Sequence, residues 1–168
     1  RLENGIIQTV PQKGDLRELA CQVKTLMEQK ANEKQVSLTV KAEKENIFAW
    51  FDEKWTREAL MNLVDNAVKY TLSGGKVTLE VVPYSLFSRI DVRDTGIGIE
   101  EEELPEIFHR FYRSRDVLSE EGVGLGLYLA REIVRSQGGY IKVSSKKGEG
   151  SVFSVFLPSE KRENVSRL

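Results

Sequence analysis

The sequence predicts a two-layer α/β sandwich, in which a mixed, mostly antiparallel sheet of about five strands is covered on one face by three helices. Segments with the 3.6-residue apolar period of a helix are interleaved with segments that alternate like strands. Hairpins as well as helical crossovers join the strands, which predicts a mixed rather than a parallel sheet. The length of 168 residues fits one domain with its own core.

Composition narrows the class of protein. The formal net charge is −1, from 25 basic and 26 acidic residues, so no overall field favours nucleic acid or an anionic membrane as the partner. The single cysteine, Cys21, excludes an internal disulfide, and without Cys or His neighbours it forms no zinc site. No apolar run approaches the roughly 20 residues that span a bilayer, and the N-terminus is no signal peptide. We therefore expect a soluble chain in a reducing cytoplasm.

The first third of the chain is predicted to form a helix and two strands. Residues 1–10 are charged and compatible with a helix, so we expect the end of a longer helix there. Asp15 is a candidate N-cap, with Glu18 three residues later and apolar side chains at helical spacing to about Glu33. Residues 36–40 alternate strictly and residues 47–50 form a short apolar run, which predicts a strand for each.

Two more helices and two hairpins are predicted in the remainder. A helix begins at about Trp55, and two antiparallel strands over residues 76–82 and 88–92 follow it. Residues 100–122 mix charge with a small apolar centre, which predicts a mobile lid. A third helix opens at the glycines from Gly122 and runs through Val134. The chain closes with a hairpin over residues 140–145 and 151–157 and a charged tail from Ser159.

The helix that begins at about Trp55 carries an unusual polar stripe opposite its apolar face. Glu58, Asn62, Asn66 and Lys69 share this stripe, and Tyr70 lies at its edge. A solvated helix face would carry mixed charges, whereas this one offers carboxylate and amide oxygens for a hard cation and a lysine for phosphate. The stripe is a candidate binding site, and a polar surface face is the alternative.

Two glycine motifs add binding chemistry. In the motif DTGIG at residues 94–98, a carboxylate at a strand end can accept a hydrogen bond from the exocyclic amine of adenine, beside backbone that the glycines expose. In the motif GVGLG at residues 122–126, backbone N–H groups before a helix can meet phosphate. Each motif alone also fits an ordinary turn. The second is no dinucleotide fingerprint and no P-loop, because its spacing differs and no Walker-type lysine follows.

The order of the motifs is more specific than any one of them. From Trp55 to Pro158 the chain has the asparagine helix, DTGIG, FHRFYR at residues 108–113, GVGLGL at residues 122–127 and a glycine-flanked hairpin. This order resembles the ATP-binding catalytic domain of bacterial sensor histidine kinases. The wider superfamily includes type II topoisomerase, Hsp90-like and mismatch-repair ATPases, and the resemblance implies their Bergerat-type ATP-binding fold.

The resemblance implies roles for the matching residues. Asn66 would ligate a Mg²⁺ ion that bridges the phosphates of ATP, with Asn62 and Glu58 behind it, and Asp94 would accept from the adenine amine. The implied catalytic residues are Asn62, Arg113, Lys69 and Glu58. Tyr70 would pack on adenine or ribose, Gly96 and Gly98 would let the base come close, and Lys69, Arg110 and Arg113 would reach the phosphates. Gly122, Gly124 and Gly126 would wrap around the triphosphate, and the other implied nucleotide-binding residues are Ile97, Tyr112, Val123, Leu125 and Leu127.

Two positions depart from the commonest family pattern, and one residue invites over-interpretation. Glu58 stands where many members carry glutamine, and Val123 where a small polar residue is frequent, although neither removes a ligand. His109 lacks the acidic neighbour and following proline of the family's phosphorylated histidine, so we expect a structural or surface role. Cys21 and Phe108 are likewise expected to be structural, Phe108 as an anchor of the lid.

The resemblance implies transfer of the γ-phosphoryl group of Mg·ATP to a histidine that this chain lacks. Residues 1–12 would be the end of the dimerisation-domain helix and a linker, residues 13–160 the catalytic domain, and residues 161–168 a charged tail. The implied partners are the kinase's own dimerisation domain, in a homodimer, and a response regulator receiver domain. The full-length kinase would be membrane-bound, with this domain in the cytoplasm and unable to phosphorylate itself in isolation.

Two alternatives stay open. One is an ATP-hydrolysing clamp of the gyrase or Hsp90 kind, in which a glutamate base precedes the metal-binding asparagine by one turn. Asn62 holds that position here, and an amide cannot accept a proton from water. The other is a serine kinase or a non-catalytic nucleotide-sensing module of the same superfamily.

Overall fold

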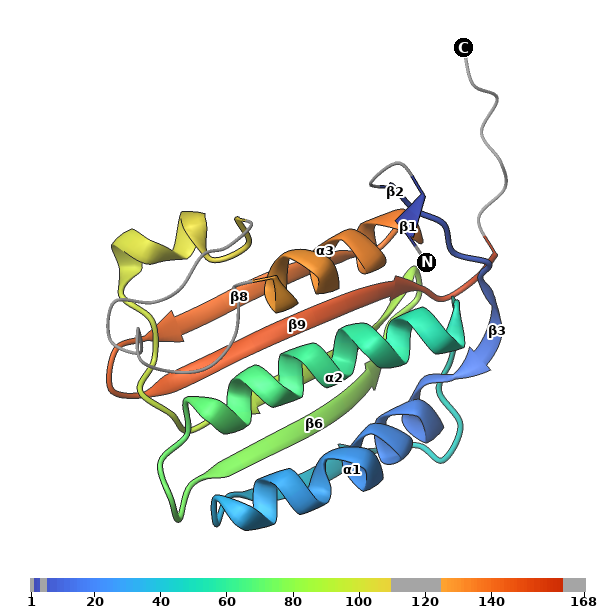
Figure 1. The fold of residues 1–168 in the computed structure, drawn as a ribbon. Helices are drawn as coiled ribbons and strands as arrows, with labels where there is room; N and C mark the ends of the chain where they lie inside the picture. The colour runs from blue at the N-terminus through green and yellow to red at the C-terminus, as the bar shows by residue number, and fades with distance from the viewer. Residues whose placement is uncertain (1, 4–5, 110–124, 162–168) are drawn as a thin grey trace.

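The computed structural model describes residues 2–3, 6–109 and 125–161, and it confirms the predicted sandwich. The main sheet has five strands in the order β4-β6-β7-β9-β8, with β4 and β6 parallel and the other neighbours antiparallel. Three α-helices cover one face of this sheet (Figure 1). The elements are α1 (Leu16–Glu33), β4 (Ser37–Ala42), α2 (Glu53–Lys69), β6 (Lys76–Pro83), β7 (Phe87–Asp94), α3 (Gly126–Ser136), β8 (Tyr140–Lys146) and β9 (Gly150–Pro158).

The helix expected at residues 1–10 is not found in the described residues of this segment, 2–3 and 6–10. The described part of this segment forms two short strands, β1 (Leu2–Glu3) and β2 (Ile6–Ile7), which pair antiparallel. The reason is local, because Ile6 and Ile7 are β-branched and the preceding Asn-Gly dipeptide favours a hairpin over a helix. A further strand, β3 (Gln12–Asp15), pairs with β5 (Phe48–Phe51), so the segment before α1 is tied to the domain.

Side-chain caps set where the first two helices begin. Asp15 accepts hydrogen bonds from the backbone N–H groups of Arg17 (3.0 Å) and Glu18 (3.4 Å), as predicted for an N-cap. Asp52 does the same for Trp55 at 3.0 Å, so α2 begins two residues earlier than its apolar period alone indicates. Both helices then bury one face. On α2 the buried residues are Thr56, Ala59, Leu60, Leu63, Val64, Ala67 and Val68.

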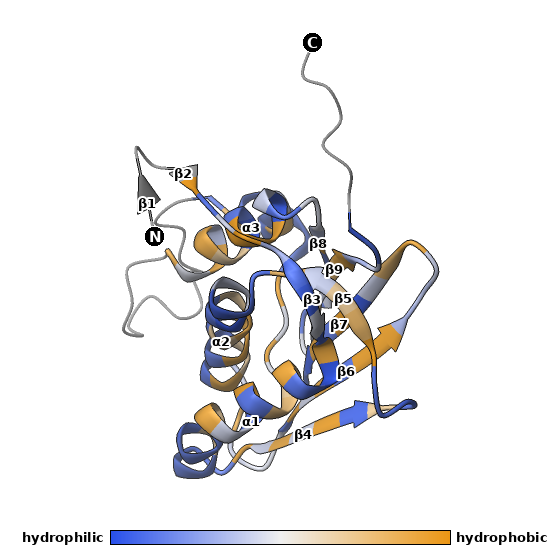
Figure 2. Ribbon diagram, turned by 90° about the vertical axis from the view of Figure 1, so that its right-hand side faces the viewer, coloured by the Kyte–Doolittle hydropathy of each residue, from blue (hydrophilic) through white to orange (hydrophobic). Residues whose placement is uncertain are grey.

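The hydrophobic core lies between the helices and the sheet. Alternate residues of the central strands point into it, and Figure 2 shows apolar residues on the sides of the helices that face the sheet. The fully buried strand residues include Val77, Leu79, Ile90, Val92, Val155 and Leu157. Within the described part of the chain, no helix combines the length and apolar character needed to cross a bilayer.

A buried polar network joins α3 to the start of α2. The side chain of Gln137 is 6% exposed, and its Nε2 donates to the hydroxyl of Thr56 at 2.9 Å and to the carbonyl of Ile133 at 3.3 Å. Its Oε1 accepts from the backbone N–H of Asp52. The carboxylate of Asp52 in turn accepts from the N–H of Val10 at 2.9 Å. Asp52 therefore connects the segment before β3 with the start of α2 and the end of α3.

Candidate nucleotide-binding site

Except for Glu58, the predicted site residues that the structure describes gather at one end of the sandwich. This end is formed by the last turns of α2, the loop that follows β7, the turn between β8 and β9, and the first turn of α3. Each element was predicted separately, and hydrogen bonds now join them.

Asp94 is the last residue of β7 and is only 7% exposed. Its Oδ1 accepts hydrogen bonds from the N–H groups of Gly96 (2.9 Å) and Ser151 (3.3 Å). None of the described residues donates a hydrogen bond to Oδ2, so this oxygen can accept a hydrogen bond from a ligand. Burial raises the pKa of the Asp94 carboxyl above its ordinary value, while the two backbone hydrogen bonds act in the opposite direction. The result is a fixed, desolvated acceptor at the end of a strand.

The loop after Asp94 packs too closely for side chains at its glycines. A Cβ on Gly96 would overlap the carbonyl oxygen of Tyr70, and Gly98 has φ +73° with a Cβ position that overlaps the carbonyl oxygen of Lys146. Ile97 between them donates its N–H to the Tyr70 carbonyl at 3.1 Å, and its own carbonyl accepts from Gly148 at 2.7 Å. The loop is thus fixed between α2 and the β8–β9 turn.

The polar stripe of α2 leads to this loop. Asn62 and Asn66 are half-buried one turn apart, and Tyr70 caps the helix with its N–H on the Asn66 carbonyl at 3.2 Å. Nδ2 of Asn62 donates to the carbonyl of Gly126 at 3.4 Å, which joins α2 to the first residue of α3. Glu58 is exposed and lies two turns before Asn66, about 12 Å along the helix axis.

The amino end of α3 can receive an anion. Its N-cap, Leu125, supplies no side-chain hydrogen bond, so the first N–H groups of the helix are not satisfied by a capping side chain. Backbone N–H groups and the helix dipole favour negative charge at such an end. Gly126 is exposed and Leu127 is half-buried, and Asn62 ties this end to the stripe of α2.

Sequence analysis did not anticipate the residues that surround Lys69 or the backbone donors from the last hairpin. Asp65 lies 3.7 Å from Nζ of Lys69 and 2.8 Å from Nζ of Lys30, an exposed residue of α1 whose approach to α2 no local pattern indicates. Ser151 and Gly148 enter the site through the pairing of β7 with β9 and the turn after β8. The sequence clue to these donors is the glycine pair Gly148 and Gly150, which lies between the two strands of the predicted hairpin.

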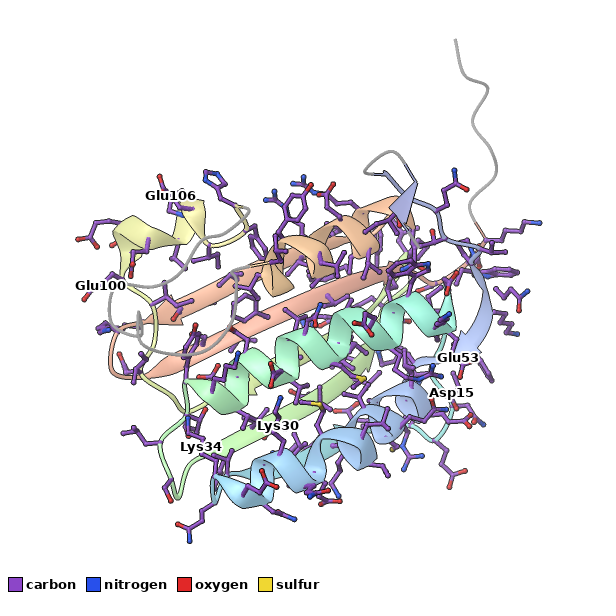
Figure 3. All side chains as sticks on the ribbon, in the orientation of Figure 1. Asp15, Lys30, Lys34, Glu53, Glu100 and Glu106 are labelled. Atoms are coloured by element: carbon purple, nitrogen blue, oxygen red, sulfur yellow. The ribbon has the colours of Figure 1, made fainter. Side chains whose placement is uncertain are left out.

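Part of the predicted site lies outside the described residues. Arg110, Tyr112, Arg113, Gly122, Val123 and Gly124 belong to this part, as does most of the predicted lid. The described margin is a 3₁₀ helix, η1 (Glu101–Glu106), and Figure 3 labels Glu106 at its end and Glu100 just before it. Phe108 is buried against Phe153, with ring centroids 6.2 Å apart, as expected for a structural residue, and His109 is exposed.

The donor set fits a magnesium ion that arrives with phosphates. Among the described residues no group of three or more His, Cys, Asp or Glu side chains could hold a metal. Magnesium bound to nucleotides takes one or two protein oxygens and completes its shell with phosphates and water. The half-buried side chain of Asn66 offers an amide oxygen as such a protein ligand, at the end of the domain that would face the phosphates.

These features define an α/β sandwich with a buried carboxylate acceptor, amide oxygens and an open helix amino end gathered at one end, a set that can accommodate a nucleotide. The family described as "Histidine kinase-, DNA gyrase B-, and HSP90-like ATPase" matches residues 51–161. The chain therefore belongs to this family. The relatives and solved structures that it resembles are histidine kinases.

Among the relatives, the adaptive-response sensory kinase SasA of Crocosphaera subtropica is 44% identical over 64% of this chain and 28% of its own length. The nucleotide-free catalytic domain of histidine kinase ThkA superposes with a TM-score of 0.80, at 27% identity over 90% of this chain and 97% of that one. Full-length ShkA in complex with AMPPNP gives 0.80 at 29% identity, over 90% of this chain and 32% of that one. ThkA is also known in complex with the response regulator protein TrrA, at a TM-score of 0.75. The chain thus spans only about a quarter to a third of SasA and ShkA.

Proposed function

We propose that this domain binds Mg·ATP and transfers its γ-phosphoryl group to a histidine on a separate dimerisation domain of the same protein. The observation that carries the proposal is Asp94, a buried acceptor with one oxygen open to a ligand, beside backbone that Gly96 and Gly98 keep accessible. The family match and the kinship with histidine kinases supply the reaction class.

Each described residue has a defined task in this proposal. Asp94 accepts the adenine amine and so fixes the purine and the direction in which the phosphates extend. The amino end of α3 and the ammonium of Lys69 receive phosphate oxygens, and Tyr70 packs on the base or ribose. Asn66 holds Mg²⁺, which neutralises charge on the phosphates when it is bound. Asn62 keeps the end of α3 in place through its bond to Gly126.

The same geometry disfavours the hydrolysing alternative. Hydrolysis needs a base that can take a proton from water near the γ-phosphate. Asn62 cannot do this, and Glu58 is solvent-exposed about 12 Å along the helix axis from Asn66. Transfer to an external acceptor needs no such base on α2, because positioning and charge stabilisation account for most of the catalysis. Arg113 and Arg110 would contribute that stabilisation from the lid.

The partners follow from the reaction. The phosphorylated histidine belongs to a dimerisation domain that residues 1–12 would connect to residues 13–160, and a response regulator receives the phosphoryl group. The complex of ThkA with TrrA supports this second partner for a relative. We place the domain in the cytoplasm, within a membrane-bound full-length kinase.

The test is phosphoryl transfer with labelled ATP. The protein alone should bind Mg·ATP but acquire no label, since transfer needs an acceptor within about 3–3.5 Å in line with the γ-phosphate. Adding the dimerisation domain of a full-length homologue of this kinase should give label on that domain, and an Asp94→Asn variant should lose most of it. Label that appears on the protein alone and disappears in a His109→Ala variant would contradict the proposal, as would steady release of phosphate.

A further inference from the structure

The ammonium of Lys69 belongs to a chain of charged contacts that begins on α1. Nζ of Lys69 lies 3.7 Å from Oδ2 of Asp65, which is one turn earlier on α2. Oδ1 of the same carboxylate is buried and lies 2.8 Å from Nζ of Lys30. Asp65 is therefore shared by two lysines from two helices, and Lys30 has the shorter contact.

The same helix also fixes the backbone that carries Lys69. Nζ of Lys34, the C-cap of α1, donates to the carbonyl of Val68 at 3.0 Å and to the carbonyl of Lys69. These carbonyls lie in the last turn of α2, where a positive charge is favourable, and the carbonyl of Val68 also accepts from the backbone N–H of Thr71 at 3.3 Å. Figure 3 shows Lys30 and Lys34 along α1, near the end of the domain where α2 ends.

We propose that Lys30 and Asp65 are positioning residues that set how readily the ammonium of Lys69 turns to the phosphates of ATP. The inference rests on the proposed function. A carboxylate that already has a cation at 2.8 Å attracts a second cation at 3.7 Å less strongly than it would alone. Lys30 therefore reduces the net electrostatic attraction between Asp65 and Lys69. As a result, less energy is needed for Lys69 to leave Asp65 and contact a nucleotide phosphate.

The proposal predicts opposite effects for the two residues and a dependence of one on the other. Lys30→Met leaves Asp65 to Lys69 alone and should weaken ATP binding about 2- to 5-fold, the range for partly exposed ion pairs. Asp65→Asn removes the attraction of this carboxylate for Lys69 and should strengthen ATP binding by a similar factor. When both changes are present, Lys30→Met should change the affinity by less than about 1.5-fold, because its route through Asp65 is gone.

The experiment is a double-mutant cycle on ATP affinity, measured by calorimetry, with adenosine as a second ligand. Adenosine has no phosphate, so a positioning role leaves its affinity unchanged, whereas general damage to the fold lowers both affinities. Lys24→Met is the matched control, since it removes the same charge from α1 but pairs with Glu28 of the same helix at 3.2 Å. Its ATP affinity should stay within about 1.5-fold of the wild type.

Several outcomes would overturn the inference. Additive effects of Lys30→Met and Asp65→Asn would mean that the two charges act on ATP independently. Equal changes for adenosine and ATP would mean a structural role, and unchanged ATP affinity in Lys69→Met would remove the residue through which both are proposed to act. Failure of the proposed function looks different, because then the wild type itself shows no saturable binding of ATP.

Discussion

The substitution Asp94→Asn separates adenine recognition from the stability of the fold. Asparagine keeps the Oδ1 acceptor for the N–H groups of Gly96 and Ser151, so the loop should remain in place. Its NH₂ group replaces the oxygen that is open to a ligand, and a donor then faces the donor of adenine. Loss of a hydrogen bond to a charged group is worth about 1.5–3 kcal/mol, or roughly 10- to 100-fold in ATP affinity.

The stability of the same variant should move in the other direction. Burial raises the pKa of Asp94 in the folded protein, which means that the charged carboxylate is disfavoured there relative to the unfolded chain. The favourable contribution of Asp94 to stability is therefore complete below its unfolded pKa and is lost as pH rises through the higher folded pKa. At neutral pH Asp94→Asn should be at least as stable as the wild type, and the difference should shrink in acid.

Calorimetry with ATP and urea unfolding, both at neutral and acidic pH, check the two statements together. Acidification through the raised pKa of Asp94 should also weaken ATP binding by the wild type more than by the variant. Equal ATP affinity of the two proteins at neutral pH would refute the adenine role. A marked loss of stability in Asp94→Asn at neutral pH would refute the assignment of Asp94 as a buried charge that is unfavourable to the fold.

Three further substitutions test other parts of the structure. Gly98→Ala should lower the free energy of unfolding, measured by urea titration, by about 1–3 kcal/mol, because position 98 has a left-handed φ and a close backbone neighbour. Gly148→Ala is the control and should lower it by less, because position 148 has φ +85° but open space around it. Gln137→Leu should cost about 1–3 kcal/mol, because it leaves the hydroxyl of Thr56 without its partner in the core; thermal unfolding would measure this. Asn66→Ala should abolish the gain in ATP affinity that Mg²⁺ provides while leaving metal-free binding nearly unchanged, and no difference between variant and wild type would contradict its role as a ligand.

The predictable parts of the fold were those with local causes. Asp15 followed by an apolar period predicts the start of α1, and strict alternation over residues 36–40 predicts a strand, observed as β4, in which Leu38 is buried. The five-stranded sheet could be inferred because hairpins and crossovers limit the possible arrangements. The error at residues 1–10 also had a local cause, since the β-branched pair Ile6-Ile7 deserved more weight than the surrounding charges.

The candidate site was predictable in its residue types but not in its connections. The stripe of α2 and the motif at residues 94–98 each follow from sequence, whereas the bond from Ser151 to Asp94 depends on the register of β7 with β9. The approach of Lys30 to Asp65 depends on how α1 packs against α2, and no periodicity within one helix specifies this. The local sequence pattern therefore does not predict contacts between elements that are distant in the sequence.

The antiparallel pairing of β7 with β9 determines where a label or a surface tether can be attached away from the candidate site. Ser151 pairs with Asp94 at one end of the sheet and Pro158 pairs with Phe87 at the other, which separates the ends by seven steps of about 3.3 Å, or roughly 23 Å. Figure 1 shows β3 on the same side of the molecule as the end of β9. A dye or a surface tether joined at residues 8–11, before β3, or at residues 159–161, after β9, is therefore attached far from Asp94, the proposed acceptor for adenine. Such an attachment should leave the proposed nucleotide site unobstructed.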